Sequence, residues 1–344
     1  MWDEVIGHEE NKKFLQRLLN GSQHPHALLF YGADGIGKKF LAQHFVRSLL
    51  CLQRQGTEPC GRCEACRLLN FATGNFAHPD FLQVAPDPDS KLRMIKTEQL
   101  HDLLAQAAFG PTLGKHKVCL IDEAETMNVE AANAFLKLLE EPPAGWMFIL
   151  IAANKNKLLP TILSRVVQVR FNPLVPTETE EILRRQGAAP AEAKLLARLG
   201  HGSLGWVQHY TRPEILSLRP VVLEYLERVP FTAPMAYLQE LKYYDNPLAQ
   251  GPFKEGQTLE LFCELLQGLL RDMLFLKLAL PAQIMNCDVE DKLKALAAKW
   301  PAAVIPSAVR AAGEAASQVA ARTNQKTVLE LLTFKLNECF EGRA

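Results

Sequence analysis

A glycine-rich stretch near the N-terminus has the residue types of a phosphate-binding loop. The segment "YGADGIGKKF" matches the pattern G-x-x-x-x-G-K-[ST] through Gly32, Gly37 and Lys38, but its last position holds Lys39. Gly35 and Gly37 permit backbone conformations that turn several N–H groups towards a phosphate, and Lys38 can reach the β and γ oxygens as a point charge. In a working loop the final hydroxyl binds Mg²⁺. Lys39 therefore puts a second cation where a metal ligand belongs.

An acidic pair forms the second candidate for nucleotide chemistry. In "VCLIDEAE", Asp122 follows a buried apolar run and Glu123 comes directly after it. An aspartate at the end of a strand can hold Mg²⁺, and the next glutamate can polarise an attacking water. Acidic residues are common at strand ends, so the interpretation depends on the position of this pair after the glycine loop. Together the two motifs predict a nucleotide-binding ancestry.

Four cysteines lie close together in "CLQRQGTEPCGRCEAC", at Cys51, Cys60, Cys63 and Cys66. This spacing can aim four sulfurs at one tetrahedral point, and Zn²⁺ is the usual occupant of such a site. Disulfides, a redox C-x-x-C pair and an iron–sulfur centre are the alternatives. A closed zinc site would be structural and not catalytic. The remaining cysteines are isolated and are predicted to be small buried hydrophobes: Cys119, Cys263, Cys287 and Cys339.

Alternating strands and helices must position these residues. Apolar runs predict buried parallel strands, with a helix "VEAANAFLKLLEE" that stops at Pro142 and Pro143. The helix "KFLAQHFVRSLL" follows the glycine loop, so the loop presents its N–H groups at a helix N-terminus. This order predicts a doubly wound α/β domain in the first half of the chain. The predicted strands are 27–31, 117–124, 146–153 and 166–171.

The second half of the chain reads as helical. Short helices around turns follow Phe171, and from about Arg212 onward apolar residues recur at helical spacing almost throughout. We therefore expect three domains: 1–171, with the cysteine module inserted at about 51–66, then a small helical domain at 172–211, and a helical domain at 212–344.

Charge and hydropathy narrow the class of protein. Lys plus Arg and Asp plus Glu each number 38, which gives a formal net charge of zero. Such a chain has no global basic field to drive nucleic-acid binding by itself. The first residues show no basic segment followed by an apolar run, so we expect no signal peptide and a cytoplasmic location. Charges interrupt the apolar stretch 259–280, which favours an amphipathic core helix over a membrane span.

The motifs, in this order, resemble the AAA+ clamp-loader subunits of bacterial DNA polymerase III. The resemblance is close over residues 2–171 and concerns only the layout beyond them. It implies a P-loop domain, then a helical lid, then a helical collar that assembles subunits into a ring. It rests on the four cysteines and on the segments "WDEVIGHEENKKFLQRLL", "HPHALLFYGADGIGKKFLA", "IDEAETMNVEAANAFLKLLEEPP" and "LLPTILSRVVQVRF".

The resemblance also implies residue roles. Lys38 corresponds to the P-loop lysine, Asp122 and Glu123 to the Walker B pair, and Asn154 to the sensor that positions water. Arg165 corresponds to the arginine finger, which places its charge on the γ-phosphate in a neighbouring subunit's site. The family's Ser-Arg-Cys pattern is broken by Val166, which is expected to pack in the strand without affecting the finger.

Two departures from the family bear on activity. Lys39 replaces the metal-binding hydroxyl, and Gly205 in "GHGSLGWV" stands where active loader subunits carry a second sensor arginine. Both changes raise the barrier to phosphoryl transfer. The resemblance therefore implies a non-motor or weakly active subunit of the polymerase holoenzyme, with structural zinc and with ATP and Mg²⁺ bound weakly or not at all. Its partners would be the gamma/tau and delta subunits and, through them, the sliding clamp and primed DNA.

Two other functions are weighed against this one. An active motor ATPase of the gamma/tau kind would keep Asp122, Glu123 and Asn154, but Lys39 and Gly205 count against it. A zinc-dependent nucleic-acid-binding module should carry basic and aromatic residues around its cysteines. The cysteine segment offers only three arginines, Arg54, Arg62 and Arg67.

Overall fold

The computed structural model describes residues 2–21, 24–71, 75–87, 93–209, 212–240, 257–280, 283–321 and 323–342. These form two compact units, one of Met1–Ile182 with His201–Gly205, the other of Leu183–Gly200 with Trp206–Ala344. The three-domain division expected above, at 171 and 211, stays a prediction.

A five-stranded parallel sheet forms the centre of the first unit, with the order β4-β5-β6-β1-β7. Every residue of β5 and β6 is buried, so β6 reads in sequence as an unbroken apolar segment and β5 as an apolar run that follows Lys117. The sheet confirms the four predicted strands, although three of them are shorter than expected. The strands are β1 (Ala27–Tyr31), β4 (Phe81–Val84), β5 (Lys117–Ile121), β6 (Trp146–Ala152) and β7 (Val167–Arg170).

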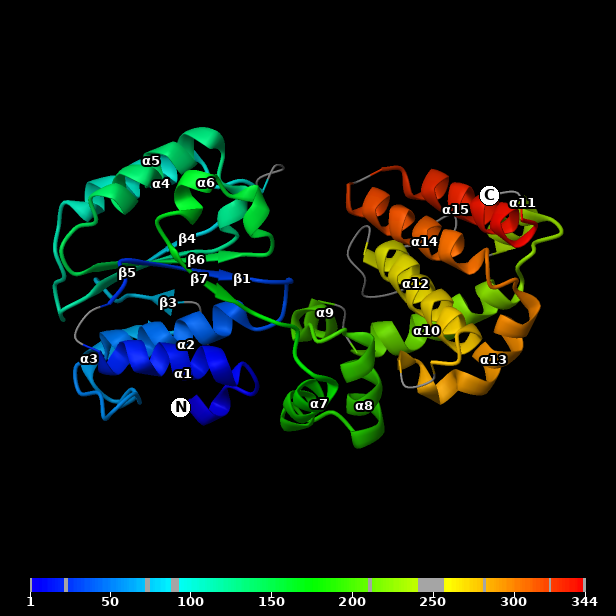
Figure 1. Ribbon diagram of the computed structural model, residues 1–344, viewed down its shortest axis with the longest axis horizontal. Helices are drawn as coiled ribbons and strands as arrows, with labels where there is room; N and C mark the ends of the chain where they lie inside the picture. Colours follow the sequence, from blue (N-terminus) through cyan, green and yellow to red (C-terminus); the bar gives the residue numbers. More distant parts are fainter. Residues whose placement is uncertain are drawn as a thin grey trace. The chain divides into compact units, whose positions relative to one another are not determined.

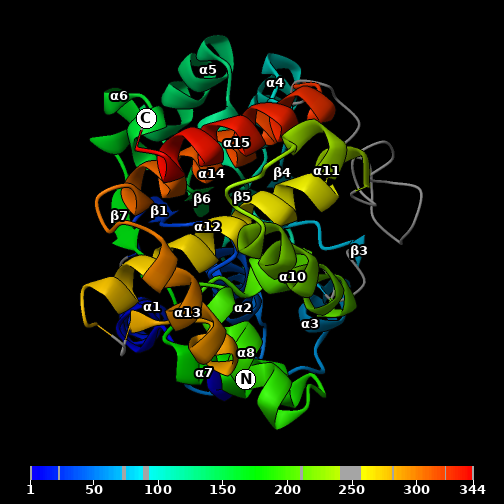
Figure 2. The ribbon, with the colours of Figure 1, turned by 90° about the vertical axis from the view of Figure 1, so that its right-hand side faces the viewer.

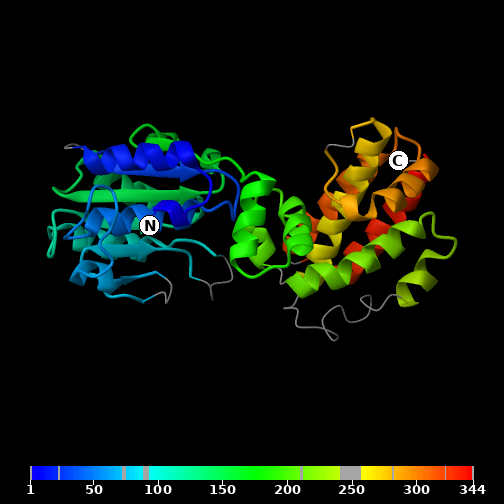
Figure 3. The ribbon, with the colours of Figure 1, turned by 90° about the horizontal axis from the view of Figure 1, so that it is seen from below.

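Helices cover both faces of this sheet (Figure 1). On one face lie α1 (Glu9–Asn20), α2 (Lys38–Leu50) and the short α3 (Glu64–Leu68). Figure 3 views the first unit from this face. On the other lie α4 (Thr97–Ala107), α5 (Val129–Glu140) and α6 (Pro160–Leu163). The predicted doubly wound α/β fold is confirmed.

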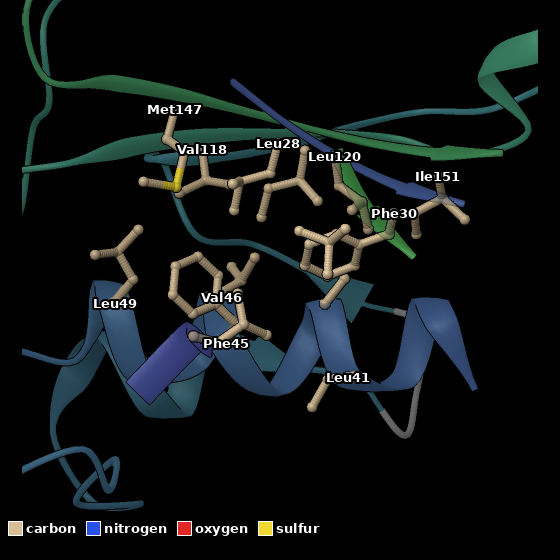
Figure 4. Close-up of a cluster of buried hydrophobic side chains, with 14 of the residues drawn as sticks. Leu28, Phe30, Leu41, Phe45, Val46, Leu49, Val118, Leu120, Met147 and Ile151 are labelled. Atoms are coloured by element: carbon tan, nitrogen blue, oxygen red, sulfur yellow. The ribbon is translucent and has the colours of Figure 1, made fainter. Parts of the chain in front are cut away.

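Apolar side chains of α2 fasten it to the sheet. Figure 4 shows Phe45, Val46 and Leu49 of α2 facing Phe30 and Val118 of the strands. Phe45 is fully buried, and burying a side chain of this size contributes about 1.5–3 kcal/mol. This packing holds the start of α2, and with it Lys38 and Lys39, at the end of β1.

The local sequence explains where α5 begins and ends. The side chain of Asn128 accepts a hydrogen bond from Ala131 N at 2.7 Å, which satisfies one of the free amides of the first turn. The helix ends at Glu140, just before Pro142 and Pro143, which cannot continue it.

Several elements of the first unit have no counterpart in the sequence prediction. These are the edge strand β4, the helix α4, and the hairpin of β2 (Leu69–Asn70) and β3 (Asn75–Phe76). Strands this short carry too little periodicity to be recognised.

Asp80, just before β4, is fully buried and accepts hydrogen bonds from the amides of Thr112, Leu113 and Gly114 at 2.6, 2.8 and 3.3 Å. This aspartate anchors the loop that leads into β5.

The rest of the chain is helical where it is described, as predicted. Helix α12 packs against α10, α13 and α14, and α14 lies beside α15 (Figure 2). No helix in the described ranges is long and apolar enough to cross a membrane. The helices are α7 (Pro176–Arg185), α8 (Pro190–Leu199), α9 (Leu204–His209), α10 (Arg212–Glu227), α11 (Pro234–Glu240), α12 (Gln257–Lys277), α13 (Glu290–Lys299), α14 (Ile305–Ala320) and α15 (Gln325–Phe340).

A buried polar network fixes the turn that follows α12. The carboxylate of Asp272, with no exposed surface, accepts from the amides of Met285 and Asn286 at 3.1 and 2.8 Å. Arg219 of α10 donates to the side chains of Asn286 and Asp288. Oδ2 of Asp272 accepts both of the amide hydrogen bonds, whereas Oδ1 has no hydrogen-bond partner within the described part of the chain and lies 3.8 Å from Nη2 of Arg271. Pairing and hydrogen bonds of this kind reduce the cost of burying a charge.

Candidate nucleotide and metal sites

The glycine loop lies between β1 and α2, as predicted. Gly35 has φ 72° and Gly37 has φ 99°, in the left-handed region that favours glycine. Gly37 is also the N-cap of α2, so the loop amides gather at a helix N-terminus, which attracts anions. The backbone of a phosphate cradle is therefore present.

The loop's own carbonyl oxygens bind the ammonium group of Lys38. Its Nζ donates to Gly32 O and Ala33 O, both at 2.6 Å, and lies 3.6 Å from a carboxylate oxygen of Asp34. Lys38 is 5% exposed. Burial lowers the pKa of Lys38, and the nearby Asp34 carboxylate partly opposes that shift. To reach a phosphate, the ammonium group would have to leave these carbonyls.

Lys39 pairs with the predicted metal ligand. Its Nζ lies 2.8 Å from Oδ2 of Asp122, directly after β5, and the Asp122 side chain is 17% exposed. The other oxygen, Oδ1, accepts from Glu123 N at 3.1 Å. The structure thus brings together two residues 83 positions apart, and places an ammonium ion on the carboxylate that is predicted to hold Mg²⁺.

Glu123 forms an ion pair with Arg93. Its Oε1 lies 2.7 Å from Nη2 of Arg93, and its backbone is left-handed, with φ 50°. Arg93 was missed by the sequence analysis because it lies in an irregular segment ahead of α4, without a motif. Both carboxylates of the predicted Walker B pair are therefore paired with cations of this chain.

The predicted sensor residue is tied to a glutamate that the sequence analysis also missed. Oε1 of Glu125 accepts from the amides of Ala153 and Asn154 at 2.6 and 3.4 Å. The side chain of Asn154 caps the short helix that follows, by accepting from Asn156 N at 2.9 Å. Asn154 thus follows β6, whose neighbour β5 leads into the acidic pair, and its side-chain oxygen already accepts a hydrogen bond.

The segment around Gly205 lies directly on the glycine loop. Gly205 N donates to Gly35 O at 2.8 Å, and Ser203 Oγ donates to Asp34 O at 2.9 Å. A Cβ atom at Gly205 would lie 2.4 Å from the Cα of Gly35. The sequence shows only that an arginine is missing here, whereas the structure shows that no side chain fits.

Gly205→Ala is accordingly expected to destabilise the first unit by about 1–3 kcal/mol, as overpacking against backbone does. Thermal unfolding with circular dichroism measures the effect. The matched control is Gly110→Ala, because a Cβ atom there would meet nothing within 4 Å. Equal melting temperatures for both variants would contradict the close contact.

Arg165 occupies the predicted place between α6 and β7. Its Nη2 lies 3.0 Å from Oε1 of Glu140, and its Nη1 donates to Thr161 O and Ser164 Oγ at 3.0 and 3.3 Å. The side chain is 36% exposed. Arg165 is therefore at the surface. It precedes β7, whereas the acidic pair follows β5, and two strands of the sheet lie between β5 and β7. Val166 is buried as expected.

The four clustered cysteines come together in space. Their sulfur atoms all lie within 4.8 Å of one another, and the Cys51 and Cys63 sulfurs are 3.8 Å apart. A tetrahedral site with Zn–S bonds of about 2.3 Å has sulfur–sulfur edges of about 3.8 Å. All four are free thiols, so the disulfide alternative is not adopted here. The geometry fits a single tetrahedral ion.

Backbone amides donate hydrogen bonds to sulfur atoms of this cluster, which favours the thiolate form that binds a cation. Cys60 N donates to the Cys51 sulfur at 3.2 Å, and Cys63 N donates to the Cys60 sulfur at 3.3 Å. The backbone hydrogen bond from Arg62 is the main cause that lowers the pKa of Cys60 to about 6, whereas burial raises the pKa of Cys66. A bound cation would favour the thiolate at every position.

One prediction about the other cysteines was wrong. Cys119, Cys263 and Cys339 are buried, but Cys287 is exposed. It begins a short 3-10 helix whose neighbours Asp288, Glu290 and Asp291 are charged, so no apolar surface covers it.

Comparison with known proteins supports one family. A family model described as "DNA polymerase III, delta subunit" matches residues 7–175. DNA polymerase III subunit delta' of Pseudomonas aeruginosa is 40% identical over 191 residues, which cover 51% of this chain and 56% of that protein. Subunit tau/gamma of Haemophilus influenzae is 33% identical over 208 residues, covering 60% of this chain and 29% of that protein.

Two further matches extend over nearly the whole chain. A gamma subunit-related protein of Thermotoga maritima, of known structure, is 18% identical with a TM-score of 0.49, covering 95% of this chain and 98% of that one. DNA polymerase III subunit delta' of Bacillus subtilis is 30% identical over 328 residues, which cover 95% of each chain. This last match shows that the chain belongs to the DNA polymerase III subunit delta' family.

Proposed function

We propose that this chain is a non-motor subunit of the DNA polymerase III clamp loader, which helps ATP-driven subunits place the sliding clamp on primed DNA. Its partners would be the gamma/tau and delta subunits in a hetero-oligomeric ring in the cytoplasm, and through them the clamp and DNA. The observation that carries the non-motor assignment is the ion pair between Lys39 and Asp122. Family membership supports the rest.

The ion pair argues against turnover on electrostatic grounds. Mg²⁺ in a working site bridges the β and γ oxygens and neutralises developing charge. Here Asp122 is already paired with an ammonium group, and Glu123 with Arg93. A metal ion would have to displace Lys39 and then lie beside its charge. Gly205 offers no cation over the γ-phosphate either.

What the chain would contribute instead is Arg165. Since the arginine is exposed on the rim of its own domain, it is available to a neighbouring subunit. Guanidinium charge at a γ-phosphate stabilises the transition state of hydrolysis. The chain would thus complete a site that another subunit forms.

The proposed metal is a single structural Zn²⁺ held by Cys51, Cys60, Cys63 and Cys66. With four protein ligands the site has no open position, so its contribution is to folding. The module also holds the N-terminus: Trp2 N donates to Glu58 Oε1 at 3.1 Å, and Trp2 Nε1 donates to Thr57 O at 2.9 Å.

Reconstitution tests the assignment. The purified chain, mixed with gamma/tau and delta subunits, should elute as one complex whose mass, from light scattering, equals a sum of all three kinds of subunit. Failure to enter the complex would refute the proposal. Strong ATP hydrolysis by the isolated chain would favour the motor-ATPase alternative instead, which the retained Asp122, Glu123 and Asn154 support.

Lys39→Thr is expected to improve binding of Mg-ATP more than it improves turnover. The hydroxyl restores a metal ligand and frees Asp122, whereas the missing lid cation still leaves transition-state charge uncompensated. Calorimetric titration with and without Mg²⁺, beside steady-state hydrolysis, separates the two effects. Lys194→Thr, on the exposed side of α8, is the control. Unchanged binding by Lys39→Thr would show that the ion pair does not limit nucleotide binding.

A further inference from the structure

Arg165 is held in place by three groups of its own chain. Glu140, the last residue of α5, lies 3.0 Å from Nη2, while the carbonyl of Thr161 and the hydroxyl of Ser164 accept from Nη1. Ser164 Oγ itself donates to Thr161 O at 3.0 Å. The guanidinium group therefore sits between the end of α5 and the single turn of α6.

These contacts involve the two terminal nitrogens of the guanidinium group, Nη1 and Nη2. Its five N–H donors lie in a rigid planar fork. Nη1 has two acceptors and Nη2 has one, whereas among the described residues none accepts from Nε. Nε–H therefore remains for an anion from outside the chain.

Glu140 is well placed to hold a cation, because it is the last residue of α5. The C-terminal carbonyls of a helix carry a partial negative charge, which attracts a cation. The Glu140 carboxylate at the end of α5 adds a full charge to that field. Without it, a long arginine side chain at a rim would sample many rotamers, and each approach to a neighbour's phosphate would have to select one of them.

We propose that Glu140 is the positioning residue for Arg165: it holds Nη2 of the guanidinium group so that Nε–H faces an anionic phosphate of a neighbouring subunit. The inference rests on the proposed function of Arg165. Glu140 does not touch the phosphate and acts only through the arginine. An exposed ion pair of this kind, 36% and 52% exposed, adds little to stability, so its effect should be sought in catalysis.

The test is a double-mutant cycle in the complete loader complex. DNA- and clamp-stimulated ATP hydrolysis is measured for the parent and for Glu140→Ala, Arg165→Ala and the double variant, after each complex is checked for assembly by size. The Arg165-dependent rate is the parent rate minus the rate of Arg165→Ala. Glu140→Ala should lower that part by about two- to fivefold, the range set by exposed ion pairs.

Two comparisons separate positioning from a general structural effect. In the Arg165→Ala background, Glu140→Ala should cause no further loss, because residues that act as one unit are not additive. Glu140→Gln should retain part of the rate, since its amide oxygen can still accept from Nη2. Glu130→Gln, exposed in the first turn of the same helix, is the matched control and should leave the rate unchanged.

The outcomes distinguish this inference from the function on which it rests. If Arg165→Ala leaves hydrolysis unchanged, the proposed finger fails, and the role of Glu140 fails with it. If Arg165→Ala slows hydrolysis but Glu140→Ala does not, or makes it faster, the finger stands and the positioning role is overturned. An equal loss from Glu140→Ala in both backgrounds would also overturn it.

Discussion

Arg165→Ala should slow DNA-stimulated ATP hydrolysis and clamp loading by the complete complex while leaving the fold, the metal and assembly intact. An arginine finger is worth about 10³–10⁵ in rate at the site it serves. Only one of several sites would lose its finger, so total hydrolysis should fall partially, while loading, which needs coordinated sites, should fall further. The change removes a surface side chain, and such changes usually alter stability by no more than about 0.5 kcal/mol.

Two variants sharpen the measurement on Arg165. Arg165→Lys should rescue poorly, because lysine keeps the charge but lacks the planar fork. Arg170→Ala removes another exposed arginine, five residues further along in β7, and should leave the rate near that of the parent. If Arg165→Ala hydrolyses ATP as fast as the parent complex, Arg165 is an ordinary surface residue and the chain has a scaffolding role.

Removal of the metal should have the largest effect on stability. The purified chain is expected to hold about one Zn²⁺, and Cys63→Ser should lose it, because Cys63 is buried among the other three sulfurs. Binding of structural zinc by small peptides contributes about 10–16 kcal/mol. Here the sheet and α2 also hold the fold, so we expect a lower melting temperature and a loosened module, not a fully unfolded chain.

The loosened module should be visible at Trp2. Its side chain is 2% exposed and donates to Thr57 O within the module. Loss of zinc should therefore shift tryptophan fluorescence to longer wavelength, and Trp2→Phe should remove most of that shift. Cys287→Ser, at an exposed cysteine outside the cluster, is the control. Elemental analysis that finds no metal, or finds iron with visible absorbance, would contradict the zinc assignment.

Local patterns in the sequence determined much of this protein. The glycine loop, the buried strands and the helix that stops at Pro142 were predicted because each depends on residues a few positions apart. The spacing of Cys51, Cys60, Cys63 and Cys66 predicted a cluster for the same reason. The strand β4 was missed because four residues carry too little periodicity.

The chemistry of the candidate site was decided by contacts between distant segments. Lys39 was recognised as a cation, but only the parallel pairing of β5, β6 and β1 carries Asp122 to within 2.8 Å of it. Likewise, the sequence showed that Gly205 stands where relatives carry an arginine, whereas the hydrogen bond from its amide to Gly35 O depends on how the chain returns to the loop after 170 residues. Glu140 and Arg165 meet because α5 ends beside α6. Such pairs leave no periodic signal in the sequence, since the free energy that brings them together comes from packing the sheet and its helices, and not from the residues themselves.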